Sequence, residues 1–230
     1  MAVGIDRRYE TKFSITDLGL YEIQHVIQTH PALFKEIHYQ RYINNIYFDS
    51  PDLKSFTDNI EGETHRRKVR LRWYGSLFGL CKEPKLEIKY KSGLLGWKVK
   101  HSLEAFKLSK DGVFCYKDLL SELNKKKDFN ISKLHLDALQ PVLLNRYKRS
   151  YYLSLDKKFR VTIDSEMEFY SINPVREFFK TFSDERKTIV ELKYDQKHVK
   201  SAQNITQGFP FRVTKNSKYV VGVERVRHWS

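Results

Sequence analysis

The sequence predicts an α+β fold in which a few helices pack outside a large antiparallel sheet. Strand-like runs rich in Val, Ile, Tyr and Phe outnumber the helix-like runs, and they are too numerous for an α/β fold. Charged and apolar side chains alternate along several of these runs, which is typical of strands whose two faces differ. With 230 residues and 40% hydrophobic content, we expect residues 1–230 to form a single domain.

Each element is predicted from its local pattern. The strand-like runs, in chain order, are Arg7–Ile15, Tyr39–Asp49, Arg66–Tyr74, Lys85–Lys91, Trp97–His101, Val142–Leu155, Arg160–Asp164, Met167–Ser171 and Thr188–Tyr194. The helical patterns are Thr16–Gln28, Ser102–Ser109, Lys117–Asn124 and Lys218–Val226. Ser217 is a candidate cap for the last helix. The stretch from Ser121 to Ser132 reads as an exposed connection.

Basic side chains gather on one face of the predicted strands. In the first strand, Arg8, Glu10 and Lys12 share a face opposite Phe13 and Ile15. The same rule sorts Lys68, Arg70 and Arg72; Glu87, Lys89 and Lys91; Lys98 and Lys100; Arg160, Thr162 and Asp164; and Glu191 and Lys193. One such strand is usually explained by an open sheet with a solvated face. The recurrence over five or more strands favours a closed barrel with a charged lumen.

A lumen of this kind cannot be dry, because an unpaired buried charge costs several kcal/mol. We therefore expect it to hold water, metal and a polyanion. The formal charge of +14, from 42 Lys+Arg and 28 Asp+Glu, fits an anionic partner. Nucleic acid is disfavoured, because Arg and Lys lie opposite the aromatic residues and are not interleaved with them on a stacking face. The sequence also lacks the GxxxxGK[ST] and GxGxxG loops of other nucleotide-binding folds.

The remaining composition bears on the compartment. Cys81 and Cys115 show neither CxxC nor paired Cys/His spacing, so no disulfide framework or structural zinc site is indicated. The N-terminus lacks the apolar core of a signal peptide, and no run approaches the roughly 20 apolar residues of a membrane span. We expect a soluble, cytoplasmic protein, and the sequence leaves its oligomeric state open.

Several motifs together resemble one family. They are Arg7–Phe13, Ile46–Pro51, Lys68–Tyr74, Tyr147–Arg149, Arg160–Asp164, Glu191–Lys193 and Lys215–Tyr219. In order and spacing, they resemble the vacuolar transporter chaperone (VTC) polyphosphate-polymerase domain, a branch of the triphosphate tunnel metalloenzymes, or CYTH superfamily. The resemblance spans nearly the whole chain.

The resemblance implies eight antiparallel strands closed into a tunnel, with the C-terminal helix at one mouth. It implies transfer of the γ-phosphate of ATP to a growing polyphosphate chain, with Mn²⁺ or Mg²⁺ as cofactor. The residues that it marks as phosphate-binding are Lys12, Arg70, Arg72, Lys89, Lys98, Arg149, Arg160 and Lys193. Surface salt bridges are the alternative explanation for this group.

The resemblance also implies which residues act in catalysis and which bind the metal. Lys215 and Lys218, three residues apart at the start of the last helix, are expected at the reacting phosphate together with Glu191. Glu191 is the expected metal ligand, with Glu10 as a second, because Mg²⁺ and Mn²⁺ prefer carboxylate oxygen. For both glutamates, an ion pair with a neighbouring lysine is the alternative.

Two features qualify these assignments. The parity of Arg149 places it with Tyr147 and Tyr151, away from Arg146 and Lys148, and a bulge is one explanation. The triphosphatase branch begins with Glu-x-Glu-x-Lys, but Arg8 stands at the first acidic position, which favours the polymerase branch. Larger eukaryotic members add a phosphate-sensing domain and membrane helices, so export would need a separate membrane partner. An inorganic or RNA 5′-triphosphatase and a non-catalytic polyphosphate-binding module remain alternatives.

Overall fold

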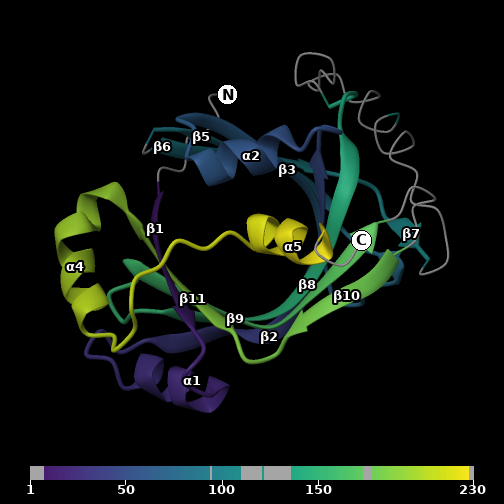
Figure 1. Ribbon diagram of the computed structural model, residues 1–230. Coiled ribbons are helices and arrows are strands. Elements are labelled where there is room, and N and C mark those ends of the chain that lie inside the picture. Colours follow the sequence, from purple (N-terminus) through teal and green to yellow (C-terminus); the bar gives the residue numbers. More distant parts are fainter. Residues whose placement is uncertain (1–7, 94, 110–120, 122–135, 173–177, 228–230) are drawn as a thin grey trace. The chain divides into compact units, whose positions relative to one another are not determined.

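The structure of the chain is a computed structural model that describes residues 8–93, 95–109, 121, 136–172 and 178–227 (Figure 1). The chain divides into two compact units. The first unit comprises Met1–Tyr42, Tyr147–Glu168 and Ser183–Ser217. The second unit comprises Ile43–Arg146, Phe169–Phe182 and Lys218–Ser230. The expectation of a single domain stays a prediction.

The fold is α+β and antiparallel, as the sequence predicted. The strands are β1 (Arg8–Ile15), β2 (Lys35–Asp49), β3 (His65–Tyr74), β4 (Gly79–Cys81), β5 (Lys85–Ser92), β6 (Leu95–Ser102), β7 (Phe106–Leu108), β8 (Gln140–Leu153), β9 (Phe159–Ile172), β10 (Phe178–Asp184) and β11 (Thr188–Asp195). In the described residues, eight of them follow the order β1-β11-β9-β8-β2-β3-β5-β6, with β10 paired to β9. Two short strands, β4 and β7, form a separate pair. Closure of the eight strands into a tunnel stays a prediction.

The helices within the described residues are shorter than the strands. They are α1 (Leu20–Gln28), α2 (Lys54–Glu61), α4 (Val199–Gln207) and α5 (Lys218–Arg227), with a single 3₁₀ turn, η1, at Gln196–His198. None of the helices that the structure describes is both long enough and apolar enough to cross a membrane.

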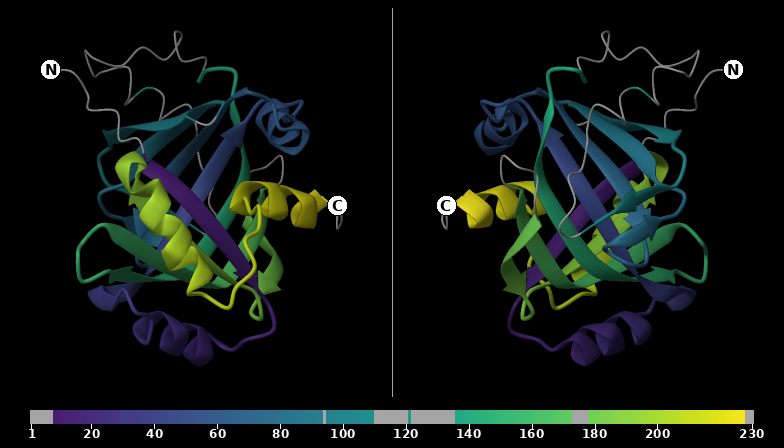
Figure 2. Two further views of the ribbon diagram at one scale, coloured as in Figure 1. Left: turned by 90° about the vertical axis from the view of Figure 1, so that its left-hand side faces the viewer. Right: turned by 90° about the vertical axis from the view of Figure 1, so that its right-hand side faces the viewer.

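The first unit has its own hydrophobic core, built on the apolar faces of β1, β9 and β11. Phe13, Val161, Ile163, Val190 and Leu192 are each fully buried there. Helix α1 adds Ile23 and Ile27 to this core, and α4 adds Ala202. Helix α4, drawn in yellow-green in the left view of Figure 2, packs against β11. Since apolar residues alternate along these strands, the charged residues between them lie on the opposite face. This alternation is what positions the first part of the site.

The second unit has a separate core under β3 and β5. Val69, Leu71, Leu86 and Ile88 are buried in it, together with Trp73. Helix α2 lies against β3 and contacts α5, the C-terminal helix (Figure 1). The charged residues of β3 and β5 again occupy the face opposite the core.

Two helix predictions need correction. Ser102–Ser109 is not a helix: β6 continues to Ser102, and Phe106–Leu108 forms β7, which pairs with Gly79–Cys81. A partner strand distant in sequence satisfies this backbone, and that pairing overrides the local helical pattern. The first helix begins at Leu20 and not at Thr16, because the Glu22 carboxylate accepts a hydrogen bond from the Gly19 amide at 2.6 Å.

Other predictions stand as follows. The two predicted strands Arg160–Asp164 and Met167–Ser171 form one continuous strand, β9. Helix α5 confirms the predicted helix Lys218–Val226 almost residue for residue. The predicted helix Lys117–Asn124 and the connection 121–132 lie almost wholly outside the described residues. Helices α2 and α4 were missed, since each is a short segment with one buried residue, Ser55 or Ala202.

Candidate functional site

The second unit gathers basic side chains around Glu87. Strand β3 pairs with β5 so that Arg70 lies opposite Glu87, and β5 pairs with β6 so that Lys89 lies opposite Lys98. Leu86 and Ile88 point into the core, so Glu87 between them points to the other face. Glu87 is 4% exposed. The strand register thus brings cations of β3 and β6 to one carboxylate of β5.

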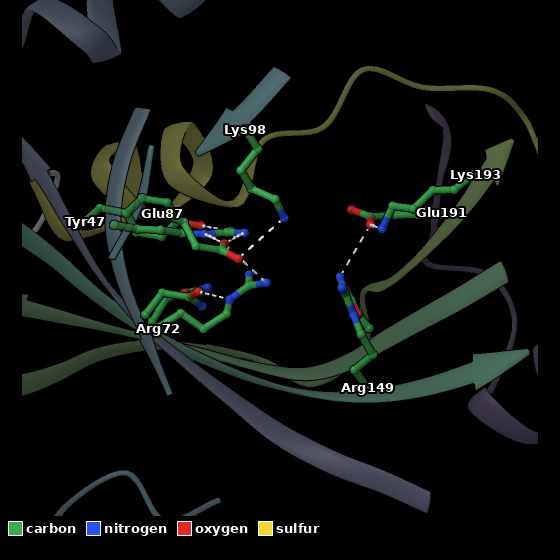
Figure 3. A network of polar contacts seen from close by, with 11 residues as sticks. Tyr47, Arg72, Glu87, Lys98, Arg149, Glu191 and Lys193 are labelled. Carbon is green, nitrogen blue, oxygen red and sulfur yellow. Dashed lines mark hydrogen bonds and ion pairs between the residues drawn. The ribbon is translucent and has the colours of Figure 1, made fainter. Parts of the chain in front are cut away.

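Three cations contact this carboxylate, and we call them with Glu87 the Glu87 cluster: Arg70, Arg72, Lys98 and Glu87 (Figure 3). Arg70 donates from Nε and Nη2 to Glu87 Oε2 at 2.8 and 2.6 Å. Arg72 Nη1 lies 3.6 Å from the same oxygen, and Lys98 Nζ lies 3.4 Å from Oε1. Charge-assisted contacts of this kind hold side chains in defined places.

The charges of the Glu87 cluster shift the pKa values of two of its own members, Glu87 and Lys98. Burial alone would raise the pKa of Glu87, but Arg70, Arg72 and Lys98 outweigh it and hold that pKa well below its usual range. Burial lowers the pKa of Lys98 to about 8; Glu87 opposes this shift, whereas Arg70 and Arg72 add to it. Three cations around one carboxylate therefore leave excess positive charge, to which a phosphate anion is suited.

Polar side chains of β2 and β8 support the arginines of this cluster. Arg72 donates from Nε to Asn45 Oδ1 at 2.8 Å, and Asn45 donates to Asn145 Oδ1 at 2.9 Å. Arg70 Nη1 lies 3.5 Å from the hydroxyl oxygen of Tyr47. Because Asn45 and Asn145 are fully buried, the guanidinium of Arg72 is fixed by a rigid partner.

The first unit holds a second cluster, in rows across β1, β11 and β9. Lys12 lies opposite Glu191, which lies opposite Thr162. In the adjacent row, Glu10 lies opposite Lys193, which lies opposite Arg160. These rows agree with the predicted faces, because residues directly opposite one another on paired strands have their side chains on the same face of the sheet.

Glu191 is the centre of this second cluster and is 5% exposed. We define the Glu191 cluster as Glu191, Lys12, Lys193, Arg149, Glu10 and Asp164. Lys193 Nζ lies 2.6 Å from Glu191 Oε2, and Lys12 Nζ lies 3.5 Å from Oε1. Arg149 Nη2 donates to Glu191 Oε2 at 3.3 Å (Figure 3).

Arg149 joins two carboxylates of the Glu191 cluster. Its Nη2 donates to Asp164 Oδ2 at 2.6 Å and its Nε donates to Oδ1, while the guanidinium lies over the Tyr147 ring at 5.2 Å. The shared face with Tyr147 is the one that parity predicts, and it is the face of Asp164 and Glu191. The regular alternation of β8 accounts for this position, so the suggested bulge is unnecessary.

Charge is balanced in the Glu191 cluster, which has three cations and three carboxylates. Burial would lower the pKa of Lys12, but Glu191 and Glu10 outweigh it, and the pKa is raised above its usual value. Asp164 and Glu191 likewise outweigh burial and raise the pKa of Arg149. Lys12 also donates to the carbonyl of Asn216, within the Lys215–Tyr219 motif, at 3.0 Å.

The carboxylates bear on the expected metal. Glu10 Oε1 lies 3.1 Å from Lys12 Nζ, so Glu10 and Glu191 approach one ammonium group. Both glutamates therefore form the ion pairs that were the alternative reading. In the described residues, no group of three His, Cys, Asp or Glu side chains is arranged to hold a metal. Two carboxylates still fit Mg²⁺ or Mn²⁺, which often take one or two carboxylates and complete their shell with substrate phosphates and water.

The other predicted residues lie at the margins of these clusters. Lys89 is exposed on β5, in a register row with Lys68 and Lys98, and Arg160 is exposed on β9 beside Lys193. Lys218 is the first residue of α5 and is partly buried. Lys215 precedes the helix and is exposed, so the helical spacing argument does not extend to it.

Sequence reasoning missed the centre of one cluster and its supports. The sequence placed Glu87 on the charged face but gave it no role. Basic residues nevertheless lie on the same face of β5 and of both strands that pair with it, β3 and β6. Asp164 was noted as part of a motif without a function. The buried amides Asn45 and Asn145 carry no local signal, since their pairing joins residues 100 positions apart.

The antiparallel strand order places the chain in a fold class, the CYTH-like fold, which it shares with solved structures of low sequence identity. A structure from Hippeastrum, described as a putative adenylyl cyclase with a dominant triphosphatase activity, has a TM-score of 0.55 and 12% identity, covering 95% of each chain. A putative adenylate cyclase from Vibrio parahaemolyticus has a TM-score of 0.52 and 10% identity, covering 94% of this chain and 97% of that one. A conserved hypothetical protein from Pyrococcus furiosus has a TM-score of 0.52 and 12% identity, with 95% and 99% covered.

Within this class, the family is shown by the sequence. The VTC domain family matches residues 7–227, nearly the whole chain, and the chain belongs to this family. The resemblance found from the motifs is therefore confirmed. No curated protein matches the chain. The structural relatives, at 10–12% identity, show the fold and nothing finer.

Proposed function

We propose that this protein is a metal-dependent polyphosphate polymerase that transfers the γ-phosphate of ATP to a growing polyphosphate chain. The observation that carries the proposal is the Glu87 cluster, in which one buried carboxylate holds three cations that the strand register brings together. Membership of the VTC domain family supports the same substrate class. Cytoplasmic location and export through a separate membrane partner belong to this proposal.

The residues divide the work of phosphoryl transfer. Arg70, Arg72, Lys89 and Lys98 bind phosphates in one unit; Lys12, Arg149, Arg160 and Lys193 bind them in the other. Arginine forks onto two phosphate oxygens, whereas lysine acts as a point charge. Positioning and neutralisation of charge supply most of the catalysis in such reactions.

The reaction balances without a covalent enzyme intermediate. An oxygen of the acceptor's terminal phosphate forms a bond to the γ-phosphorus of ATP, and the bond from that phosphorus to the β–γ bridging oxygen breaks. The acceptor gains one phosphate and ADP leaves. Lys215 and Lys218 neutralise charge on the transferred group, and the N-terminus of α5 favours an anion there. Glu191 and Glu10 would hold the Mn²⁺ or Mg²⁺, which neutralises charge on the nucleotide phosphates when bound.

The direct test is polyphosphate synthesis by the purified protein. With ATP and Mn²⁺ we expect a ladder on a gel that resists phosphatase and disappears with exopolyphosphatase, together with ADP in equal amount to the phosphate incorporated. Mg²⁺ and short polyphosphate primers are tested in parallel. A variant that reverses charge in the Glu87 cluster, Arg72→Glu, should bind no tripolyphosphate and form no ladder.

The main alternative is hydrolysis of a triphosphate by the same fold. The Hippeastrum protein, described as having a dominant triphosphatase activity, gives this alternative its support. Arg8 occupies the first acidic position of the Glu-x-Glu-x-Lys motif of the triphosphatases, which favours the polymerase. Release of orthophosphate from ATP or tripolyphosphate without chain growth would establish the hydrolase. Tight polyphosphate binding without turnover under any metal would establish a binding module.

The lowered pKa of Lys98 predicts how phosphate binding depends on pH. Below pH 8 Lys98 is charged and attracts phosphate; above it, the free protein holds this side chain neutral. A bound phosphate returns the pKa toward the usual value of about 10.4, so binding above pH 8 requires uptake of a proton. We expect tripolyphosphate affinity to fall about tenfold between pH 7 and pH 9 from this group alone.

The matched control for this prediction is Lys98→Arg, measured by titration calorimetry in two buffers of different ionisation enthalpy. Arginine stays charged throughout this range, so the variant should lose the proton uptake and show a flatter pH profile. Titration of the ligand is common to both proteins and cancels in their difference. Identical profiles for the two proteins would remove Lys98 from the binding site.

A further inference from the structure

Helix α5 is held in place within the second unit near its first residue, Lys218, which is proposed to act in catalysis. Tyr219, its second residue, is 2% exposed, and its hydroxyl donates to Asp49 Oδ2. Further along, a Cβ at Gly222 would lie 2.4 Å from Leu143 and 2.7 Å from Phe169, so the bare glycine allows the helix to pack closely. The helix is therefore held at two successive turns, and Lys218 directly precedes the first point of attachment.

Asp49 is an unusual partner for this helix because it already caps another. It ends β2, is fully buried, and accepts amide hydrogen bonds from Ser55 at 2.9 Å and Phe56 at 3.0 Å. These are the second and third residues of α2, whose N-cap, Leu53, has φ of 56° and no side-chain oxygen. Asp49, four residues before Leu53, thus supplies the side-chain oxygens that an N-cap residue usually provides.

One carboxylate consequently joins β2, α2 and α5. Oxygen Oδ1 receives the amides of Ser50 and Ser55, and Oδ2 receives the amide of Phe56 and the hydroxyl of Tyr219. Burial and the hydrogen bond to Asp49 both raise the pKa of Tyr219, so the phenol stays protonated and donates. The hydrogen bonds to a buried anion resist displacement by water.

Tyr47 extends this arrangement to the Glu87 cluster. Its ring centroid lies 5.1 Å from that of Tyr219, and its hydroxyl oxygen lies 3.5 Å from Arg70 Nη1. Tyr47 and Asp49 are two residues apart on β2, so their side chains share a face of the strand. A continuous set of contacts therefore runs from Glu87 through Arg70, Tyr47 and Tyr219 to the start of α5.

We propose that Asp49 and Tyr219 are positioning residues for Lys218: together they hold the first turn of α5 at a fixed place beside the Glu87 cluster. The inference rests on the proposed function in one respect, namely that Lys218 contacts a phosphate of the substrate. A lysine carried on a fixed helix turn loses less conformational freedom when it binds than one carried on a mobile turn. Tyr219 therefore contributes to phosphate affinity only through Lys218.

A double-mutant cycle tests this dependence. Tyr219→Phe removes one hydroxyl and keeps the ring against Tyr47, while Asp49 keeps its amide donors. We expect Tyr219→Phe and Lys218→Ala each to weaken tripolyphosphate binding about tenfold by titration calorimetry, or about 1.4 kcal/mol. The double variant should be weakened about tenfold as well, since the second change removes a contribution already lost.

Tyr152→Phe is the matched control. Tyr152 is 2% exposed in the other unit, its hydroxyl bonds to Gln24, and it lies in neither cluster. Its loss should lower stability without changing tripolyphosphate affinity. Hydrogen exchange provides a second readout: Tyr219→Phe should speed exchange of the α5 amides and leave those of α2 unchanged, since Asp49 still caps α2.

Each outcome is decisive. If Tyr219→Phe leaves affinity within about twofold of wild type, or if the effects of the two changes multiply in the double variant, the positioning role is wrong. Tripolyphosphate binding does not depend on whether the enzyme builds or hydrolyses the chain. A cycle with the expected coupling in a protein that forms no ladder from ATP would overturn the polymerase proposal and keep the positioning role.

Discussion

Replacing Glu87 with glutamine is expected to lower the free energy of unfolding by about 3–5 kcal/mol in the absence of phosphate. The carboxylate is 4% exposed and holds Arg70, Arg72 and Lys98, so its neutralisation leaves the buried Arg72 and two partly exposed cations close together without a counter-charge from Glu87. Urea denaturation at low salt, with circular dichroism as the probe, measures the change.

Added tripolyphosphate makes this prediction specific to a phosphate site. An anion that takes the place of the carboxylate should restore part of the lost stability, so the midpoint of Glu87→Gln should rise more with ligand than that of wild type. Asp58→Asn is the control, because Asp58 pairs on α2 with Lys54, an exposed lysine, and ion pairs of exposed side chains contribute little to stability. Equal stabilisation of Glu87→Gln and wild type by tripolyphosphate would count against phosphate binding in the Glu87 cluster.

Glu191→Gln is expected to reduce the rate of polyphosphate synthesis at least about 100-fold while tripolyphosphate affinity is kept or increased. The substitution removes the proposed metal ligand and, at the same time, releases Lys12, Lys193 and Arg149 from one of their carboxylates. Loss of stability should be smaller than for Glu87→Gln, because Glu10 also contacts Lys12 and Asp164 also contacts Arg149.

Single-turnover kinetics and calorimetry separate the two effects of Glu191→Gln. Glu166→Gln is the matched control: Glu166 pairs with Lys148 at 3.1 Å on the same unit but stands outside both clusters, and it should leave turnover unchanged. Synthesis by Glu191→Gln at the wild-type rate would remove Glu191 from catalysis. A parallel loss of binding and turnover would reassign it as a residue that merely maintains the structure.

Parity along the strands correctly predicted the face on which the site residues lie. Alternation along β1, β3, β5 and β11 placed Lys12, Arg70, Glu87 and Glu191 on the charged face, and the structure confirms that face for each. The same rule placed Arg149 correctly with Tyr147. Parity assigns a face because successive side chains of a strand point in opposite directions, whatever the partner strand is.

Alternation along the strands did not predict which charged residues pair with one another. That Glu87 gathers Arg70, Arg72 and Lys98, and that Glu191 gathers Lys12, Lys193 and Arg149, depends on which strands pair and in what register. Alternation does not reveal register, since a slip of two residues preserves every face. The predicted helix at Ser102–Ser109 failed for a related reason, because the pairing of β7 with β4 lies outside any local window.

By itself, the sequence determined the class of fold, the charged face of several strands and the family, because these follow from local alternation and from motifs read in order. Only the tertiary structure decided which carboxylate serves which cations, and that Asp49 joins the start of α2 to Tyr219 on α5, 170 residues away. Those contacts arise when distant segments are packed and their buried polar groups must find partners, a requirement that no short stretch of sequence expresses.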